Sequence, residues 1–396
     1  MSSLKYWVWL ASLPGLYNSS KLHLLQHFGD PENIYFADAE DYLQVEGLSP
    51  LQSALLADKS LSRSDEILSG CTRENLFLLT LHDAAYPARL RNIYDPPVLL
   101  YGKGKLPIFD EEAAVSVVGT RRCTPYGIRT AEALGYELAG QGALVISGLA
   151  KGIDAAAHRG ALRAGGLTCA VVGGGVDVIY PEENRRLYED IAATGVILSE
   201  YPPATEPRGS HFPARNRIIS GLSVAALVVE APEKSGALIT AQAALEQGRD
   251  VFAVPGPIDA PNSRGCNLLI REGAGLVSCG EDLLENYRGR FPAKLRGGRV
   301  SLPKLPEGGA EPPAPAKAAL PRLDLRKNKE GLTDDQIVIL RQLSDTEPLL
   351  TDEAAEKTGI PIRRVLSALT VLEIDGYVRQ DGARRFVRMV EFEDKE

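Results

Sequence analysis

The stretch AVSVVGTRRCTPYGIRTAEALGYELAGQGALVISG, residues 114–148, decides the fold class. It contains two short, nearly continuous apolar runs, AVSVV and ALVIS, with a helical pattern between them. Strands that are buried on both faces have such continuous apolar sequences, and they occur in parallel sheets that helices cover. The stretch therefore predicts one βαβ unit with a right-handed crossover.

The same alternation continues to residue 256. The further apolar runs are LTCAVVGGG, VILSE, VAALVVEA and DVFAVPG, and the helical patterns between the runs include GIDAAAHRGALRAGG, PEENRRLYEDIAATG, PARNRIISG and SGALITAQAALEQG. Repeated βαβ units form a doubly wound sheet, so the sequence predicts an α/β fold with an extended Rossmann-like parallel sheet core over residues 113–290. Ligand-binding residues of such folds lie at the carboxyl ends of the strands.

Four further segments flank this core. Residues 1–75 have short helical patterns broken by turns and predict a small helical domain of the SAM or helix-hairpin-helix type. Residues 76–112 contain prolines that favour extended backbone, and we interpret them as an irregular connector. Residues 291–331 are rich in Pro, Gly and Ala and predict a flexible linker. Residues 332–390 give three helical segments and a hairpin pattern, which together are typical of a winged helix.

Composition narrows the function classes. The 396 residues are 44% hydrophobic and 24% charged, as in folded globular proteins, and no apolar run is long enough to span a membrane. The N-terminus does not resemble a signal peptide, which favours a cytoplasmic location. Five scattered cysteines fit neither a disulfide framework nor a zinc site, and we expect no metal and no cofactor. The net charge of −8 argues against nucleic acid, but the acidic excess is concentrated in the first 95 residues.

Glycines end three successive predicted strands, at Gly119, Gly148 and Gly173, and Gly152 follows the second. Glycine at such turns lets backbone N–H groups approach an anion at a helix N-terminus. Arg121 follows the first turn. The stretch HFPARNRIISGLS adds Arg215 and Arg217 near the fourth strand. Arginine suits phosphate oxygens, so the pattern predicts a phosphate-binding edge of the sheet.

Motifs for catalysis are lacking from the sequence. The core has no GxxxxGK[ST], no GxGxxG with a following ribose-binding acid, no GxSxG and no HExxH. Asp154 and His158 form the one acid and imidazole pair placed to do chemistry. We interpret Asp154 as complementing a helix N-terminus and His158 as hydrogen-bonding within the loop layer, because no nucleophile or metal site accompanies them.

Seven motifs together resemble those of the DNA-processing protein A family, DprA or Smf. They are SVVGTRR, ISGLAKGIDAAAHRGAL, VVGGGVDVIYPEENRRLY, ILSEYPPATEP, HFPARNRIISGLS, EAPEKSGALITAQAALEQGRDVFAVPG and SRGCNLLIREGA, and they run almost continuously from residue 114 to 287. The first glycine turn has GTR where the family commonly has GSR, so Thr120 keeps the hydroxyl. The helical N-terminal region and the winged helix resemble accessory domains of the family.

The resemblance implies a binding protein and no enzyme. Family members bind single-stranded DNA, dimerise through the Rossmann-like domain, and load RecA recombinase onto strands coated by single-strand-binding protein, chiefly in natural transformation. By resemblance, arginines would contact DNA phosphates, glycine turns would supply N–H donors, and two polar residues would contact phosphate or base. The implied site comprises Gly119, Thr120, Arg121, Ser147, Gly148, Gly152, Gly173, Arg215, Asn216 and Arg217.

Some alternatives stay open at this point. Residues two apart on a helix do not share a face, so Arg215 or Arg217 could instead be structural, paired with Glu230 or another carboxylate. A nucleotide-binding or nucleotide-hydrolysing Rossmann-like enzyme or sensor is the competing function, although EAPEKSGALITA lacks the paired glycines of that class. A scaffold with solvated basic loops is a third.

Arginines also gather in the predicted winged helix. They lie where a DNA-binding helix and wing would carry them, although acids in the same domain balance their charge. Contact with duplex DNA and contact with a partner protein are both compatible with this pattern. The candidates are Arg363, Arg364, Arg384 and Arg385.

Overall fold

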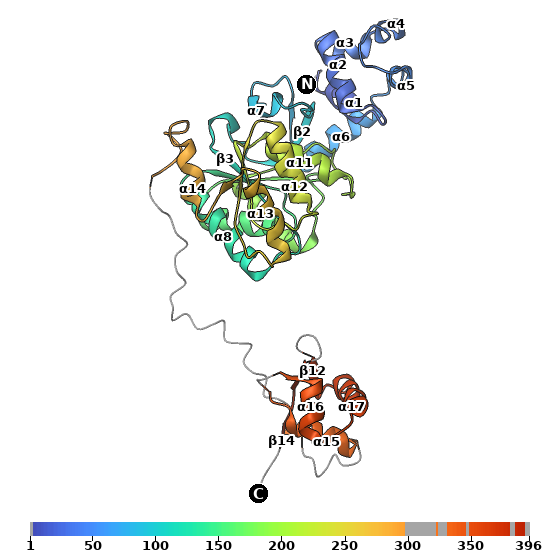
Figure 1. Cartoon of the computed structure of the whole chain (residues 1–396). Coiled ribbons are helices and arrows are strands. Elements are labelled where there is room, and N and C mark those ends of the chain that lie inside the picture. Colours follow the sequence, from blue (N-terminus) through green and yellow to red (C-terminus); the bar gives the residue numbers. More distant parts are fainter. Residues whose placement is uncertain (1–2, 298–321, 324–330, 346–347, 381–384, 393–396) are drawn as a thin grey trace. The chain divides into compact units, whose positions relative to one another are not determined.

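The computed structural model describes residues 3–297, 322–323, 331–345, 348–380 and 385–392. They form two compact units, divided at residue 303. The first unit contains the helical region and the sheet, and the second contains the winged helix (Figure 1). Within the described residues, no helix is long and apolar enough to cross a membrane.

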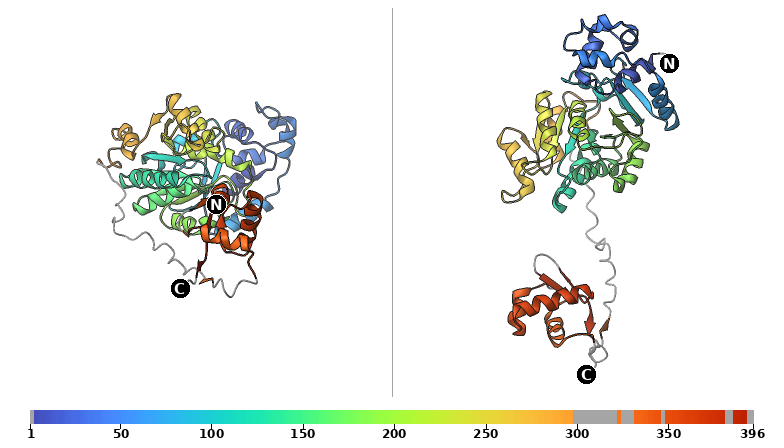
Figure 2. Two further views of the ribbon diagram at one scale, coloured as in Figure 1. Left: turned by 60° about the horizontal axis from the view of Figure 1, so that its bottom comes forward. Right: turned by 90° about the vertical axis from the view of Figure 1, so that its right-hand side faces the viewer.

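The N-terminal region is a bundle of six helices. They are α1 (Leu4–Ser12), α2 (Asn18–Phe28), α3 (Pro31–Phe36), α4 (Ala39–Tyr42), α5 (Pro50–Leu55) and α6 (Ser62–Arg73). The buried face of α1 includes Trp7, Trp9 and Leu10, which are continuous with the apolar core on one face of the sheet. The bundle lies beside the sheet edge that carries β2 (Figures 1 and 2).

One nine-stranded sheet forms the centre of the first unit. Its strands are β1 (Phe77–Thr80), β2 (Leu99–Gly104), β3 (Ala114–Val118), β4 (Leu144–Ser147), β5 (Thr168–Val171), β6 (Val196–Ser199), β7 (Ala225–Val228), β8 (Asp250–Ala253) and β9 (Gly275–Leu276). The spatial order is β1-β2-β6-β5-β4-β3-β7-β8-β9. Strands β3 to β9 pair in parallel, and β1 and β2 pair antiparallel. The predicted Rossmann-like core is confirmed.

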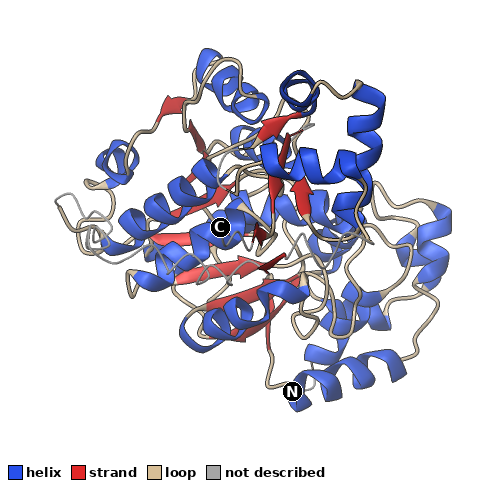
Figure 3. Cartoon of the chain, turned by 90° about the horizontal axis from the view of Figure 1, so that it is seen from below, coloured by secondary structure: helices blue, strands red, loops and turns tan. Residues whose placement is uncertain are grey.

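Helices cover both faces of the sheet, as Figure 3 shows. They are α7 (Ala88–Arg91), α8 (Pro125–Gly140), α9 (Ile153–Arg163), α10 (Arg185–Thr194), α11 (His211–Gly221), α12 (Gly236–Glu246), α13 (Arg264–Arg271) and α14 (Gly280–Leu284), with short 3-10 turns at Phe109–Glu111, Glu182–Asn184, Pro261–Ser263 and Glu285–Tyr287. Helices α8, α9, α10 and α14 pack on one face, and α11 to α13 pack on the other. The central strands are therefore buried on both sides, which explains their continuous apolar sequence.

Two expected boundaries are wrong. Residues 76–112, expected to be an irregular connector, contain β1 and β2, which join the sheet by antiparallel pairing. Antiparallel pairing to β6 leaves these strands without a βαβ pattern, which is why the sequence did not reveal them. Residues 291–295, expected to begin the linker, include buried Phe291 and Leu295, which pack under α8. Most of the rest of the expected linker lies outside the described residues.

The second unit contains three helices and short strands. They are β10 (Arg322–Leu323), α15 (Asp334–Gln342), β11 (Leu349–Leu350), α16 (Thr351–Thr358), α17 (Ile362–Ile374), β12 (Val378–Gln380), β13 (Arg385–Arg388) and β14 (Glu391–Phe392). Strands β11, β13 and β12 form one antiparallel sheet, and β10 pairs in parallel with β14. Three helices with this hairpin are the expected winged helix.

Candidate functional site

Two adjoining cavities lie at the carboxyl ends of the parallel strands, close to the point where the chain reverses its direction across the sheet between β3 and β7. This switch point is where doubly wound folds bind ligands. About 500 and 960 Å³ of unoccupied space belongs to the two cavities when the part open to solvent is included. The first is lined by the glycine turns after β4 and β5, and the second by the turn after β3 and by α11 and α12.

Arg121 and Phe212 line both cavities. The Arg121 guanidinium carbon lies 4.5 Å from the centroid of the Phe212 ring, a cation–π contact. The ring of exposed Tyr180 also lies near Phe212, with the two centroids 5.9 Å apart. Sequence reasoning missed Phe212, although an aromatic residue beside arginines in HFPARNR was a signal for a stacking site.

The turn after β3 is held by one hydrogen bond to the segment after β7 and one within the turn. Thr120 N–H donates to Glu230 O at 2.7 Å, and Thr120 Oγ1 accepts from Arg122 N–H at 3.2 Å. A Cβ at Gly119 would lie 2.5 Å from the side chain of Ile153 on α9, so this glycine allows the helix to approach the strand. Arg121 is thereby exposed at the mouth of the cleft.

The turn after β4 differs from the expected anion cradle. Ser147 is completely buried and its hydroxyl donates to Val117 O at 2.6 Å, so it faces the strand layer and not the cleft. Gly148 N–H donates to Asp154 Oδ2 at 3.1 Å, which removes it as a donor to a ligand. Gly152 has φ +81°, and a Cβ there would lie 2.7 Å from Thr120 O. The expected ligand contacts of Ser147 and of the Gly148 N–H are therefore contradicted.

Gly173 does line the first cavity, as expected, and a Cβ there would lie 3.2 Å from the Phe212 ring. Its carbonyl oxygen is 2.9 Å from His211 Nδ1, which ties the start of α11 to the turn after β5. The His211 ring in turn stacks on Tyr201, with the centroids 4.1 Å apart. These contacts fix the position of Phe212, the next residue of α11.

Arg215 forms part of the floor of the second cavity. Only 4% of the residue is exposed, and its Nη1 donates to Gly148 O at 2.9 Å and to Val171 O. Burial lowers the pKa of Arg215 to about 10, and the Asp154 carboxylate partly opposes this shift. The guanidinium is committed to main-chain carbonyls. The expectation that it reaches a DNA phosphate is therefore not supported by its position.

Arg217 points away from the cleft, toward two carboxylates. Within the described part of the chain, neither cavity has Arg217 among its lining residues. Its guanidinium pairs with Asp95 and Glu200, not with Glu230, whose carboxylate accepts from the Thr124 N–H and hydroxyl. Asn216, in contrast, lines the second cavity, as expected.

Asp154 and His158 are both buried, and their contacts agree with a structural role. Asp154 lies in the first turn of α9 and accepts from Gly148 N–H. Thr168 Oγ1 donates to Val145 O and therefore accepts from His158 Nδ1 at 2.7 Å. We had expected His158 to hydrogen-bond within the loop layer. Its partner Thr168 instead belongs to strand β5, in the sheet. Burial, followed by the charges of Arg215 and Arg159, lowers the pKa of His158 to about 3.

Exposed cations surround the cleft. Arg121 and Lys151 line the first cavity, and Arg121, Arg122 and Lys234 line the second. Among the described residues that line the two cavities, Asp154 is the one carboxylate, and it is buried next to Arg215. The open surface of the cleft is therefore cationic although the chain as a whole is acidic. The sequence analysis had not selected Arg122, Lys151 or Lys234.

Comparison with known proteins assigns the chain to a family. The family model described as DNA recombination-mediator protein A matches residues 77–288, more than half of the chain. The chain belongs to this family. A second model, the DprA winged helix domain, matches residues 311–383. Membership makes the chain a DNA-processing recombination-mediator protein.

Relatives of the DNA recombination-mediator protein A family match over most of the chain. Protein Smf of Synechocystis is 37% identical over 98% of this chain and 99% of its own length. DNA processing protein DprA of Streptococcus pneumoniae is 49% identical over 52% of this chain and 72% of its own. The X-ray structure of the pneumococcal DprA aligns with a TM-score of 0.63 at 38% identity, covering 74% of this chain and 99% of that one.

The candidate arginines of the winged helix differ in their exposure and in their ion pairing. Arg363 and Arg364 are exposed at the start of α17, but Arg364 makes a two-pronged ion pair with Asp335, at 2.7 and 2.8 Å. Arg385 is exposed on β13, and Arg384 lies outside the described residues. Contact with duplex DNA and contact with protein both stay predictions for this domain.

Proposed function

We propose that the cleft binds single-stranded DNA. The observation that carries the proposal is the Arg121 guanidinium held over the Phe212 ring between the two cavities. An aromatic face next to exposed cations serves both parts of a nucleotide, because a base can stack on the ring and its phosphates can lie near the charges. Arg121, Arg122, Lys151 and Lys234 are the proposed phosphate contacts.

A single strand fits this chemistry better than a duplex. Bases of a duplex are already stacked on each other, whereas bases of a single strand can be splayed onto protein aromatic rings. Backbone charge and stacking do not depend on base identity, so we expect little sequence preference. Thr120, Gly173 and Asn216 complete the proposed contact surface at the cleft.

The proposed partners follow from the family assignment. A recombination mediator acts by delivering a strand to a recombinase, so we propose that the bound DNA is passed to RecA in the cytoplasm, on strands first covered by single-strand-binding protein, as in natural transformation. We also propose that the protein acts as a homodimer and that it is not an enzyme. Sedimentation with RecA, and RecA filament formation on coated strands, test this part independently of the cleft.

A direct titration tests the proposed ligand class. We would measure fluorescence anisotropy of a labelled oligothymidine, of a duplex of the same length, and of labelled thymidine monophosphate. Tight binding of the single strand, with weaker binding of the other two, is expected. Tight binding or turnover of the mononucleotide without affinity for the strand would favour the nucleotide-binding alternative. Equal affinity for single strand and duplex would place the binding in the winged helix.

A further inference from the structure

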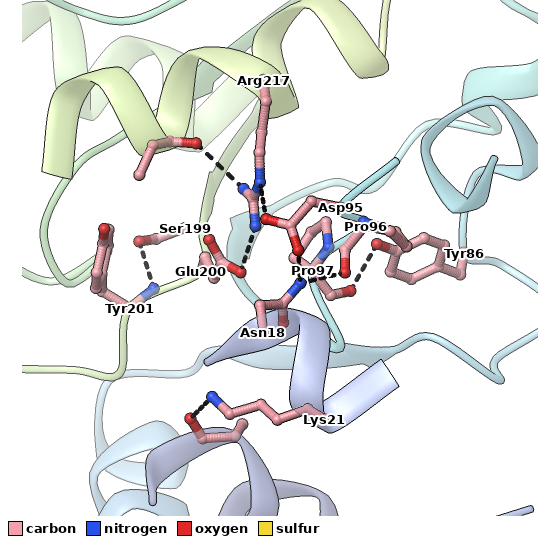
Figure 4. A network of polar contacts seen from close by, with 12 residues as sticks. Asn18, Lys21, Tyr86, Asp95, Pro96, Pro97, Ser199, Glu200, Tyr201 and Arg217 are labelled. Atoms are coloured by element: carbon pink, nitrogen blue, oxygen red, sulfur yellow. Dashed lines mark hydrogen bonds and ion pairs between the residues drawn. The ribbon is translucent and has the colours of Figure 1, made fainter. Parts of the chain in front are cut away.

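Arg217 joins three segments that are far apart in the sequence, as Figure 4 shows. On α11, its Nε donates to Asp95 Oδ2 at 2.9 Å and its Nη2 to Glu200 Oε1 at 2.8 Å. Only 16% of the Arg217 side chain is exposed. Burial alone would lower the pKa of Arg217, but the Glu200 and Asp95 carboxylates outweigh it and raise the pKa. The guanidinium is therefore a firmly charged link between α11, the loop before β2 and the end of β6.

Asp95 also binds the N-terminal helices. Asn18, the first residue of α2, donates through Nδ2 to Asp95 Oδ1 at 2.7 Å and to Pro96 O at 2.8 Å. Lys21, less than one turn later, donates to Ala11 O within the bundle. Burial lowers the pKa of Lys21, and the charges of Glu200 and Asp95 partly offset this shift. Two cations and two carboxylates, from the bundle and from the sheet region, thus form one network.

The network lies close to the cleft along two routes. Phe212 precedes Arg217 by five residues on α11, about 7.5 Å along a helix axis. By the second route, Tyr201, which follows Glu200 in the sequence, stacks on His211 at the start of α11. A shift of α11 would therefore move the ring on which Arg121 lies. Neither Asn18 nor Lys21 lines the cavities among the described residues, so they can act on the cleft only through this network.

We propose that Arg217 is a positioning residue of the DNA cleft, which holds α11 and Phe212 in place by fastening them to the N-terminal helical bundle. This proposal rests on the proposed binding of single-stranded DNA. It also gives the helical bundle a part in that function: through Asn18, Lys21 and Asp95, the bundle sets the position of the stacking ring. Arg217 itself contacts no phosphate.

The test compares full-length Arg217→Gln with Arg186→Gln, a control at an exposed arginine of α10. Arg217→Gln should impair the stacking of a base on Phe212. The affinity of this variant for oligothymidine should therefore fall about fivefold or more, which is part of the loss expected when one base no longer stacks. The dependence of log affinity on log salt should keep its wild-type slope, because no phosphate contact is lost. A slope flattened by about 0.7 would overturn the proposal and make Arg217 a phosphate contact.

A second variant tests the part of the helical bundle. Asn18→Ala combined with Lys21→Met should reproduce the loss of affinity, again with the wild-type salt slope. Wild-type affinity in this variant would overturn the coupling to the bundle. Arg217→Lys, which keeps the charge but loses the two-pronged geometry, should recover only part of the affinity.

A readout without DNA separates this proposal from the proposed function. Hydrogen exchange of residues 211–221 should be faster in Arg217→Gln than in wild type and unchanged in Arg186→Gln, because the network restrains α11. Unchanged exchange in Arg217→Gln would overturn the positioning role. If wild type failed to bind oligothymidine while exchange still responded, the proposed function would fall and the restraint of α11 would stand.

Discussion

The Arg215 guanidinium lies directly against Gly148, where its Nη1 donates to the Gly148 carbonyl oxygen at 2.9 Å. A Cβ at Gly148 would lie 2.3 Å from Arg215 Nη2. The glycine is thus required by a buried arginine and not by a bound anion. This contact supports the floor of the cleft.

Gly148→Ala should therefore destabilise the protein. The added methyl group forces the buried guanidinium away from its carbonyl partners, and overpacking of this kind costs about 1–3 kcal/mol in the free energy of unfolding. Urea denaturation measures the change. Gly209→Ala is the matched control, because nothing lies within 4 Å of a Cβ there. Equal stability of the two variants would contradict the assigned contact.

Arg121→Ala should weaken single-strand binding and reduce its salt dependence. The exposed guanidinium is expected to neutralise one phosphate, so its removal should make the slope of log affinity against log salt less steep by about 0.7. Anisotropy titrations over a range of salt concentrations give the slope, with Arg186→Ala as control. A weaker affinity with an unchanged slope would mean that Arg121 acts only by holding Phe212.

Phe212→Ala should have the complementary effect. Loss of one stacked base typically costs about 1–3 kcal/mol of binding free energy, while the number of phosphate contacts is unchanged. We expect a lower affinity at every salt concentration and a wild-type slope. Phe212→Trp should retain binding, because the larger ring can still stack. If Phe212→Ala bound oligothymidine as wild type does, stacking in this cleft would be excluded.

His158 should make the fold sensitive to acid. Its pKa is lowered from 6.5 to about 3, so the unfolded chain binds the proton first and stability is lost as the pH falls below 6.5. At pH 5 this loss amounts to about 2 kcal/mol relative to neutral pH. His158→Leu removes the titrating group. Its unfolding free energy should therefore fall less than that of wild type between pH 7.5 and pH 5, and equal pH dependence in both would refute this role.

The sequence alone determined the layout of the sheet domain and the place of the site. The apolar runs predicted strands β3 to β8 because burial on both faces leaves a local signal in each strand, and the glycine turns pointed to the sheet edge where the two cavities lie. The antiparallel strands β1 and β2 left no such signal. The local sequence pattern also pointed to Arg121. This residue is exposed because it lies in the turn after β3.

Only the tertiary structure decided which arginines face the cleft. Arg215 and Arg217 are two residues apart on α11, and both are engaged inside the protein by groups 67 and 122 residues away in the sequence, at Gly148 and Asp95. No local pattern can indicate whether a guanidinium meets a carbonyl, a carboxylate or solvent, because those partners are brought to it by the packing of distant segments. The same packing brought Phe212 under Arg121 and made a cationic cleft in an acidic chain.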